Sequence, residues 1–214
     1  MTSLNCLLCE NSSNFYHQDN KRSYFRCNNC ELIFVPRNEQ LSPKEEKSVY
    51  DLHQNIPDDP GYRKFLQRFV TPLNESIPRH SKGLDFGSGP GPTLHLMLAE
   101  LGHSCLNYDI YYAHLPELLV SGQYDFIAST EVVEHLSSPA VIFKQLFDLL
   151  KPGGCLAIMT KRSQNLERFK TWHYIQDPTH ICFYNEFNLQ WIANKYNARV
   201  TFPHSDVAIF HTNH

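Results

Sequence analysis

The chain has 214 residues, a formal net charge of −3 and 42% hydrophobic residues, which suits one full domain with a small appendage. It contains no run of about 18 apolar residues, which a membrane helix needs, and its first residues lack the basic and apolar regions of a signal peptide. Its small negative charge gives no general attraction to nucleic acid or anionic lipid. We therefore expect a soluble, cytoplasmic protein without a membrane partner.

Two cysteine pairs near the N-terminus form the array C-x2-C-x17-C-x2-C at Cys6, Cys9, Cys27 and Cys30. Two such pairs complete a closed tetrahedral zinc site with no open position, so we expect a structural ion that supplies folding energy. Short aromatic strands on either side of a polar turn complete a predicted zinc ribbon over residues 1–37. This segment carries four Lys/Arg against three Asp/Glu, which disfavours a nucleic-acid partner but leaves one open.

Residues 38–80 are predicted to form a helical linker that packs on the main domain. The segment "SPKEEKSVYDLH" begins with Ser42 and Pro43 and has acidic residues in its first turn, which are signals of a helix start. A second helix is expected in "DDPGYRKFLQRFVTPL", where aromatic and apolar residues recur along one face. The main domain then occupies residues 81–214.

A glycine-rich loop follows a short apolar strand at the start of the main domain. It contains Gly87, Gly89 and Gly91, and a predicted helix and a second strand ending in Asp109 follow it. Glycines permit a tight turn and close approach of the backbone to a ligand at a helix N-terminus. Asp109 lies 18 residues after Gly91, near the spacing at which nucleotide-binding units place an acid for the ribose hydroxyls.

Three segments together resemble the class I S-adenosylmethionine-dependent methyltransferases. "LDFGSGPG" is similar to the first motif of that family, "YDFIASTEVVEHL" to the end of its fourth strand, and "LLKPGGCLAIMT" to the turn into its fifth. The resemblance implies a Rossmann-like α/β fold, with a mostly parallel sheet and an antiparallel C-terminal edge strand, and a methyltransferase activity. The C-terminal "ARVTFPHSDVAIF" is accordingly predicted to form two more strands.

The resemblance also implies which residues contact the cofactor. Asp85 and the loop 87–91 would hold the methionine moiety, Asp109 the ribose, and the backbone at Thr130 and Glu131 the far side. The full predicted set is Asp85, Phe86, Gly87, Ser88, Gly89, Gly91, Asp109, Ile110, Thr130, Glu131, Tyr62 and Arg63.

The chain departs from the family pattern after Asp109. Only 14 residues separate Asp109 from Tyr124, where the family usually fits a helix, a third strand and an acid that contacts adenine. We expect the adenine contacts to come instead from Ile110 and its neighbour, or from the helix that carries Tyr62 and Arg63. The Arg63 guanidinium could also pair with the carboxylate of the cofactor.

The stretch "EVVEHL" at residues 131–136 puts Glu131, Glu134 and His135 at positions i, i+3 and i+4, directly after the apolar run "YDFIAST". On one helical turn these side chains would share a face. The turn would lie at the carboxyl edge of an open α/β sheet, where ligands bind. Downstream, the polar and aromatic insertion "WHYIQDPTHICFYNEF" offers His173 and His180 as further site residues.

E-x-x-E-H with a later T-H resembles two groups of O-methylating enzymes: the small-RNA 2′-O-methyltransferases, in which two Glu and two His hold a divalent cation, and the ubiquinone-biosynthesis O-methyltransferases. The match covers Glu131, Glu134, His135 and Thr179-His180. It implies Mg²⁺ or Mn²⁺ on Glu131, Glu134, His135 and His180, a cation that would lower the pKa of an acceptor hydroxyl. A metal-free general base stays open as the alternative. The candidate catalytic residues are His135, His180, His173 and Glu131.

The leading hypothesis is an S-adenosylmethionine-dependent methyltransferase that methylates an oxygen of a small hydroxylated metabolite. Methylation of a sugar carbon or of RNA stays open, because zinc-binding N-termini also occur in such methyltransferases. A non-catalytic, methyltransferase-like binding module is the alternative from another class, and the short segment after Asp109 supports it. A nicotinamide-dependent oxidoreductase is disfavoured by the G-x-G-x-G spacing of the loop.

Overall fold

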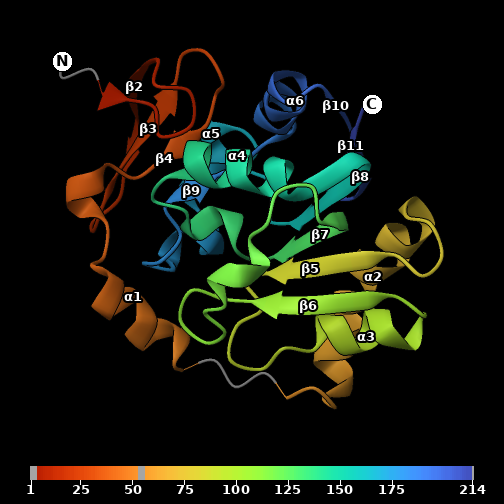
Figure 1. Ribbon diagram of the computed structural model, residues 1–214. Coiled ribbons are helices and arrows are strands. Elements are labelled where there is room, and N and C mark those ends of the chain that lie inside the picture. Colours follow the sequence, from red (N-terminus) through yellow and green to blue (C-terminus); the bar gives the residue numbers. More distant parts are fainter. Residues whose placement is uncertain (1–3, 53–55, 214) are drawn as a thin grey trace.

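A six-stranded sheet forms the centre of the computed structural model, which describes residues 4–52 and 56–213. Its strands lie in the order β10-β11-β8-β7-β5-β6 (Figure 1). Strands β5 to β8 pair in parallel, whereas β11 is antiparallel to β8 and β10 to β11. The predicted Rossmann-like fold with an antiparallel C-terminal edge is confirmed. The strands are β5 (Lys82–Phe86), β6 (Ser104–Tyr108), β7 (Tyr124–Thr130), β8 (Leu150–Met159), β10 (Ala198–His204) and β11 (Val207–Thr212).

Helices cover both faces of this sheet (Figure 1). The alternation of side chains along β7 divides the core, because Phe126 and Ala128 pack with α2 and α3 whereas Ile127 packs with α4 and α6. In the part of the chain that the structure describes, no helix is long and apolar enough to cross a membrane. The helices are α1 (Pro43–Tyr50), α2 (Pro60–Ser76), α3 (Leu94–Glu100), α4 (Pro139–Leu149), α5 (Leu166–Lys170) and α6 (Glu186–Lys195).

Local side-chain bonds explain where two of these helices begin. Ser42 precedes α1 and forms a capping box with Glu45, in which the Ser42 hydroxyl accepts from the Glu45 amide and the Glu45 carboxylate accepts from the Ser42 amide. Asn185 caps α6 in the same reciprocal way with Asn188. Both starts satisfy amides that would otherwise lack partners, and the start of α1 agrees with the sequence prediction.

The segment between β6 and β7 contains no strand of the sheet. It holds an isolated bridge between Asp109 and Ala113 and one short 3₁₀ helix, η2 (Pro116–Leu118). Strand β6 is therefore an edge of the sheet. This arrangement leaves the carboxyl ends of β5 and β6 open toward the side on which α1 lies (Figure 1).

A second sheet, with the order β1-β2-β3-β4-β9, contains the predicted ribbon. Its strands are β1 (Leu4–Asn5), β2 (Ser12–Gln18), β3 (Ser23–Cys27), β4 (Ile33–Phe34) and β9 (Cys182–Phe183). The fifth strand, β9, comes from the insertion that follows β8, so the ribbon sheet includes residues from the main part of the chain. The boundaries predicted at residues 37 and 80 stay predictions.

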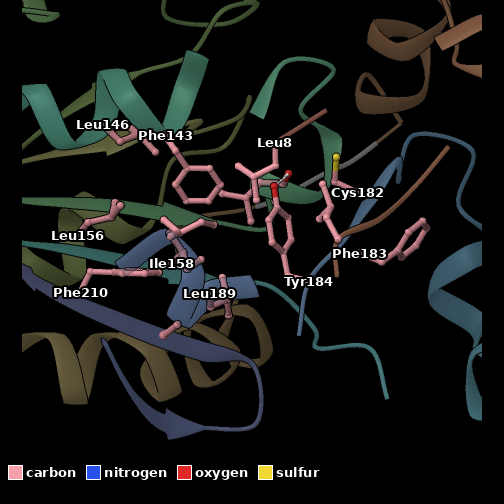
Figure 2. Packing of buried hydrophobic residues seen from close by; sticks show 14 of the residues in the cluster. Leu8, Phe143, Leu146, Leu156, Ile158, Cys182, Phe183, Tyr184, Leu189 and Phe210 are labelled. Carbon is pink, nitrogen blue, oxygen red and sulfur yellow. Dashed lines mark hydrogen bonds between the residues drawn. The ribbon is translucent and has the colours of Figure 1, made fainter. Parts of the chain in front are cut away.

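The core continues without a break between this sheet and the central one. Leu8 of the ribbon lies beside Cys182 and Tyr184, and these pack toward Phe143 of α4 (Figure 2). All four side chains are almost completely buried. The Tyr184 hydroxyl is satisfied, because it donates to the Val133 carbonyl oxygen at 3.1 Å. The ribbon therefore rests on the segment after β7, which is the segment that carries "EVVEHL".

The four ribbon cysteines converge as a metal site requires. Their Sγ atoms all lie within 4.8 Å of one another. Backbone amides point at two of them: the Leu8 amide donates to Cys6 Sγ, and the Asn29 and Cys30 amides donate to Cys27 Sγ, each at 3.4 Å. Such bonds stabilise thiolates, and a set of four thiolates suits Zn²⁺. The donor set therefore fits the predicted structural ion.

We expect the purified protein to carry one zinc ion per chain and Cys9→Ser to lose most of it. Because the site supplies folding energy to a small sheet, the Tm of Cys9→Ser should fall by about 5–10 °C. Elemental analysis and thermal unfolding would measure both. Cys105→Ser, which changes a thiol of β6, is the matched control. Unchanged zinc content in Cys9→Ser would contradict the assignment.

Candidate functional site

A cavity of about 820 Å³ opens at the carboxyl ends of β5, β6 and β7. The glycine loop after β5 forms one part of its lining, and residues of "EVVEHL" and of the insertion after β8 form another. Helix α1 contributes Glu46 and Tyr50, and α2 contributes Tyr62 and Phe65. The carboxyl edge of a parallel sheet is the usual place for a ligand.

The glycine loop is shaped by contacts on two sides. The Gly87 and Ser88 amides donate to the Tyr108 carbonyl oxygen at 2.8 and 3.1 Å. Gly87 has φ +85°, and a Cβ there would lie 2.4 Å from Val132 Cγ2, so no larger residue fits. Gly89 has φ +66°, and a Cβ there would meet no atom within 4 Å. The backbone at Gly89 therefore faces open space.

Asp109 ties the loop to the end of β6. Its Oδ2 accepts from the Gly89 amide at 2.9 Å. Its Oδ1 accepts from the Tyr111 and Tyr112 amides at 2.8 and 3.0 Å. The residue predicted to bind ribose thus also fixes the backbone on both sides of the cavity mouth. It lines the cavity, so its remaining lone pairs face a ligand there.

Asp85, in β5, has one carboxylate oxygen that accepts no hydrogen bond from the described residues. The side chain is 2% exposed, and its Oδ1 has no hydrogen-bond partner among the described residues. Burial, with the nearby Asp109 charge, raises the pKa of Asp85 to about 7. A buried acceptor without a donor, beside a cavity, fits a ligand that brings its own donor, such as the ammonium group of an S-adenosylmethionine molecule.

Most of the residues predicted to contact the cofactor line this cavity: Asp85, Phe86, Gly87, Ser88, Gly89, Asp109, Ile110, Thr130, Glu131 and Tyr62. Gly91 and Arg63 are not among its lining residues. Arg63 points instead to α3, where it forms an ion pair with Glu100 at 2.5 Å. The buried, unpartnered Asp85 and the open backbone at Gly89 fit the predicted cofactor.

The stretch "EVVEHL" does not form the single helical turn that its spacing predicts. A 3₁₀ turn, η3, includes only Val133–His135, and Glu131 precedes it with φ +53°. This left-handed backbone is uncommon for glutamate. Glu131 therefore lies outside the 3₁₀ turn, and it is not part of the cluster that Glu134 and His135 form with His180.

Glu134, His135 and His180 form one compact cluster, and its two histidines line the cavity. One possible ligand atom from each lies within 4.8 Å of the other two. Glu134 is fully buried; its Oε1 accepts a short hydrogen bond from the Tyr174 hydroxyl, and its Oε2 has no partner among the described residues. Burial raises the pKa of Glu134 and, with the charge of Glu134, raises the pKa of Glu131 to about 8.

Backbone carbonyls fix the tautomers of both histidines. His135 Nδ1 lies 3.1 Å from the Thr179 oxygen, and His180 Nδ1 lies 2.8 Å from the Tyr174 oxygen. Because a carbonyl oxygen only accepts, each Nδ1 carries a proton and each Nε2 carries the lone pair. Burial and the neighbouring His135 lower the pKa of His180. Neutral imidazoles oriented in this way are the usual histidine ligands of a cation, and equally suit a general base.

The remaining predicted residue, His173, lies apart from this cluster. Its Nε2 is 3.0 Å from Lys161 Nζ, and Lys161 itself lines the cavity. The sequence did not single out Lys161, because a lysine directly after a buried strand carries no signal of its own. The bond of Tyr174 to Glu134 joins residues 40 positions apart, which no spacing rule could reveal.

The comparisons with known proteins agree with this geometry. The family described as a methyltransferase domain matches residues 59–201, which is more than half of the chain. Among curated proteins, ubiquinone biosynthesis O-methyltransferases of Shewanella pealeana and Psychrobacter cryohalolentis are 33% and 35% identical over 93 and 97 residues. These alignments span 41% of the chain and only 38% and 36% of the two relatives.

Solved structures share the fold at low identity. The PH0226 protein of Pyrococcus horikoshii has a TM-score of 0.55 at 12% identity, with 73% of this chain and 93% of that chain covered. A Burkholderia thailandensis 1,6-didemethyltoxoflavin-N1-methyltransferase, solved with S-adenosylhomocysteine, has a TM-score of 0.53 at 13% identity and covers 94% and 100%. The family match over residues 59–201, on a glycine loop and a fourth-strand motif that resemble it, shows that the chain belongs to the methyltransferase-domain family.

Proposed function

We propose that the protein is an S-adenosylmethionine-dependent methyltransferase that methylates an oxygen of a small hydroxylated molecule. The observation that carries the proposal is a single cavity with two different walls. The glycine loop and Asp109 line one part of it, and His135 and His180 line another, with the buried Glu134 in the same cluster as these two histidines. The partial similarity to ubiquinone biosynthesis O-methyltransferases supports oxygen as the acceptor atom.

The cofactor, when bound, supplies a methyl group on a sulfonium sulfur, and the protein supplies position and electrostatics. Asp85 would accept from the amino group of the cofactor, Asp109 from the ribose, and the Gly89 backbone would approach the cofactor closely. Glu131 and Thr130 line the cavity between this wall and the acceptor side. Holding the acceptor oxygen in line with the methyl group lowers the barrier mainly by proximity and orientation.

Glu134, His135 and His180 would hold a divalent cation if one takes part. The cation would lower the pKa of the acceptor hydroxyl, and one carboxylate with two imidazoles suits Mn²⁺ better than Mg²⁺, which prefers oxygen ligands. Glu134 Oε2, which has no partner among the described residues, and the convergence of both histidines on it support this ligand set. Without a cation, His180 Nε2 would take the hydroxyl proton directly.

We place the methyl acceptor in the part of the cavity that includes His135 and His180, here called the acceptor side. Aromatic side chains and one basic residue line it. Tyr50, Tyr111 and Tyr174 line the cavity together with Leu136. Lys161 is the single lysine or arginine among the cavity's lining residues, and its Nζ lies 5.4 Å from the centroid of the Tyr174 ring. These walls favour a flat, hydroxylated acceptor with an acidic substituent.

We expect the affinity for S-adenosylhomocysteine to fall as the pH falls, because protonation of Asp85 removes the charge that attracts the amino group. With a pKa of about 7, the Kd should rise about tenfold between pH 8 and pH 6. Isothermal titration calorimetry would measure it. Glu131, with a pKa of about 8, shares the cavity, so Asp85→Asn isolates the part due to Asp85: its binding should be weaker and its pH dependence smaller than that of the native protein.

Failure of the native protein to bind S-adenosylhomocysteine at any pH from 6 to 8 would overturn the proposed function. A pH dependence that persists unchanged in Asp85→Asn would remove Asp85 from the cofactor site while leaving the site itself intact.

Mn²⁺ should bind the native protein, and Glu134→Gln should weaken this binding at least about tenfold, because a neutral amide replaces the buried carboxylate. Electron paramagnetic resonance of free Mn²⁺ would report it. Glu117→Gln, a change of an exposed glutamate in η2, is the control. If the native protein binds no Mn²⁺, the cation is excluded and the general-base role of His180 stands.

A further inference from the structure

Arg22 is a buried cation at the start of β3, and it belongs to the ribbon. Only 7% of the residue is exposed. Its Nη1 donates to the carbonyl oxygens of Pro178 and His180, each at 2.9 Å. Its Nη2 donates to those of Ile175 and Asp177, at 2.7 and 3.0 Å. One guanidinium group therefore holds four carbonyls of the insertion after β8.

The geometry of these bonds requires arginine. A guanidinium is planar and presents its donors as a rigid fork, so that it can bond four acceptors from two nitrogens. An ammonium group has three donors around one point and cannot reach all four carbonyls. The insertion therefore curves around Arg22. Charge-assisted bonds to four of its carbonyls fix the backbone of residues 175–180.

The residues held in this way form the acceptor side of the cavity. Tyr174, Asp177 and His180 line it. The Tyr174 hydroxyl donates to Glu134, and the His180 ring is oriented by the Tyr174 carbonyl. A shift of the backbone at residues 175–180 would therefore move the imidazole and the phenol together.

The ribbon also holds the end of the insertion. Strand β4 pairs with β9, with Phe34 opposite Cys182, and the Val35 amide donates to the Ile181 oxygen at 2.9 Å. The Ile181 amide in turn donates to the Glu134 oxygen at 2.8 Å. These bonds place residue 181 between the ribbon and η3. In the preceding loop, residues 175–180, Arg22 holds four carbonyls, and the Tyr24 hydroxyl and the His135 ring each bond one.

We propose that Arg22 is a positioning residue for the acceptor side of the site, acting through the carbonyls of residues 175–180. It sets the position of His180 and Tyr174 relative to Glu134 without lining the cavity itself. The glycine-loop wall lies on separate elements, β5 and β6, and does not depend on it. This inference rests on the proposed function, because it assigns the acceptor role to the His180 side of the cavity.

Arg22→Lys keeps the charge and removes the fork, so it tests the geometry of the bonds. We expect hydrogen exchange at the amides of Thr179 and His180 to accelerate about tenfold or more, because several charge-assisted bonds are lost. Exchange in β5 and β7 and the Kd of S-adenosylhomocysteine should stay within about twofold of the native values. Mn²⁺ affinity should fall. Arg22→Gln, which also removes the charge, should act in the same direction if Arg22→Lys folds poorly.

The matched control is Arg26→Lys, since Arg26 lies in β3, the strand that Arg22 directly precedes, but pairs with Glu31 on the surface. It should leave all three measurements unchanged. Unaltered exchange at residues 179 and 180 in Arg22→Lys would overturn the proposal. Equal acceleration in β5 and β7 would also overturn it, because Arg22 would then stabilise the whole fold. Absence of S-adenosylhomocysteine binding in the native protein would instead count against the proposed function, and the exchange result would still decide the role of Arg22.

Discussion

The hydrogen bonds between the ribbon and residues 175–183 are the constraint on which the site depends. Strand β9 has no neighbour in the central sheet, and it is held in place by β4 of the ribbon. The insertion before it contains a 3₁₀ turn, η4 (His173–Gln176), but no regular ladder of its own. Its shape therefore comes from Arg22, from β4 and from the core around Tyr184 (Figure 2). The ribbon therefore holds in place the part of the cavity wall that the insertion forms.

A second constraint is the accumulation of buried carboxyl groups at the carboxyl edge of the sheet. Asp85, Glu131 and Glu134 all have raised pKa values, and burial is the largest cause for each. A buried charge without a partner lowers the free energy of unfolding of the protein. A cationic ligand next to Asp85 and a divalent cation next to Glu134 would both reduce this cost. The pattern is what a site that binds positive groups requires.

The sequence predicted the elements that are local in character. Glycine spacing, the acid after β6 and the start of α1 at Ser42 depend on neighbours a few residues apart, and the structure has them where the patterns indicated. The cysteine array also predicted its own convergence, because each pair acts within one turn. The family resemblance added the mostly parallel sheet with its antiparallel C-terminal edge.

The interactions that the sequence could not predict connect distant segments. Nothing about a single arginine in a polar turn indicates that it binds carbonyls more than 150 residues away. The i, i+3, i+4 spacing of "EVVEHL" wrongly indicated one helical face, because the left-handed backbone at Glu131 is imposed by its surroundings. Arg63 was expected near a ligand, but it lies close enough to Glu100 of α3 to pair with it. Each case depends on packing that only the folded chain contains.

One cavity is proposed to hold the cofactor against the glycine loop and a cation or base against the wall that the ribbon supports. X-ray diffraction from crystals grown with S-adenosylhomocysteine and Mn²⁺, with anomalous data for manganese, would locate both groups. We expect the amino group of the ligand beside Asp85, its ribose beside Asp109, and an anomalous peak between Glu134, His135 and His180. A ligand bound outside this cavity, or ordered S-adenosylhomocysteine whose sulfur is directed away from His180, would contradict this proposal.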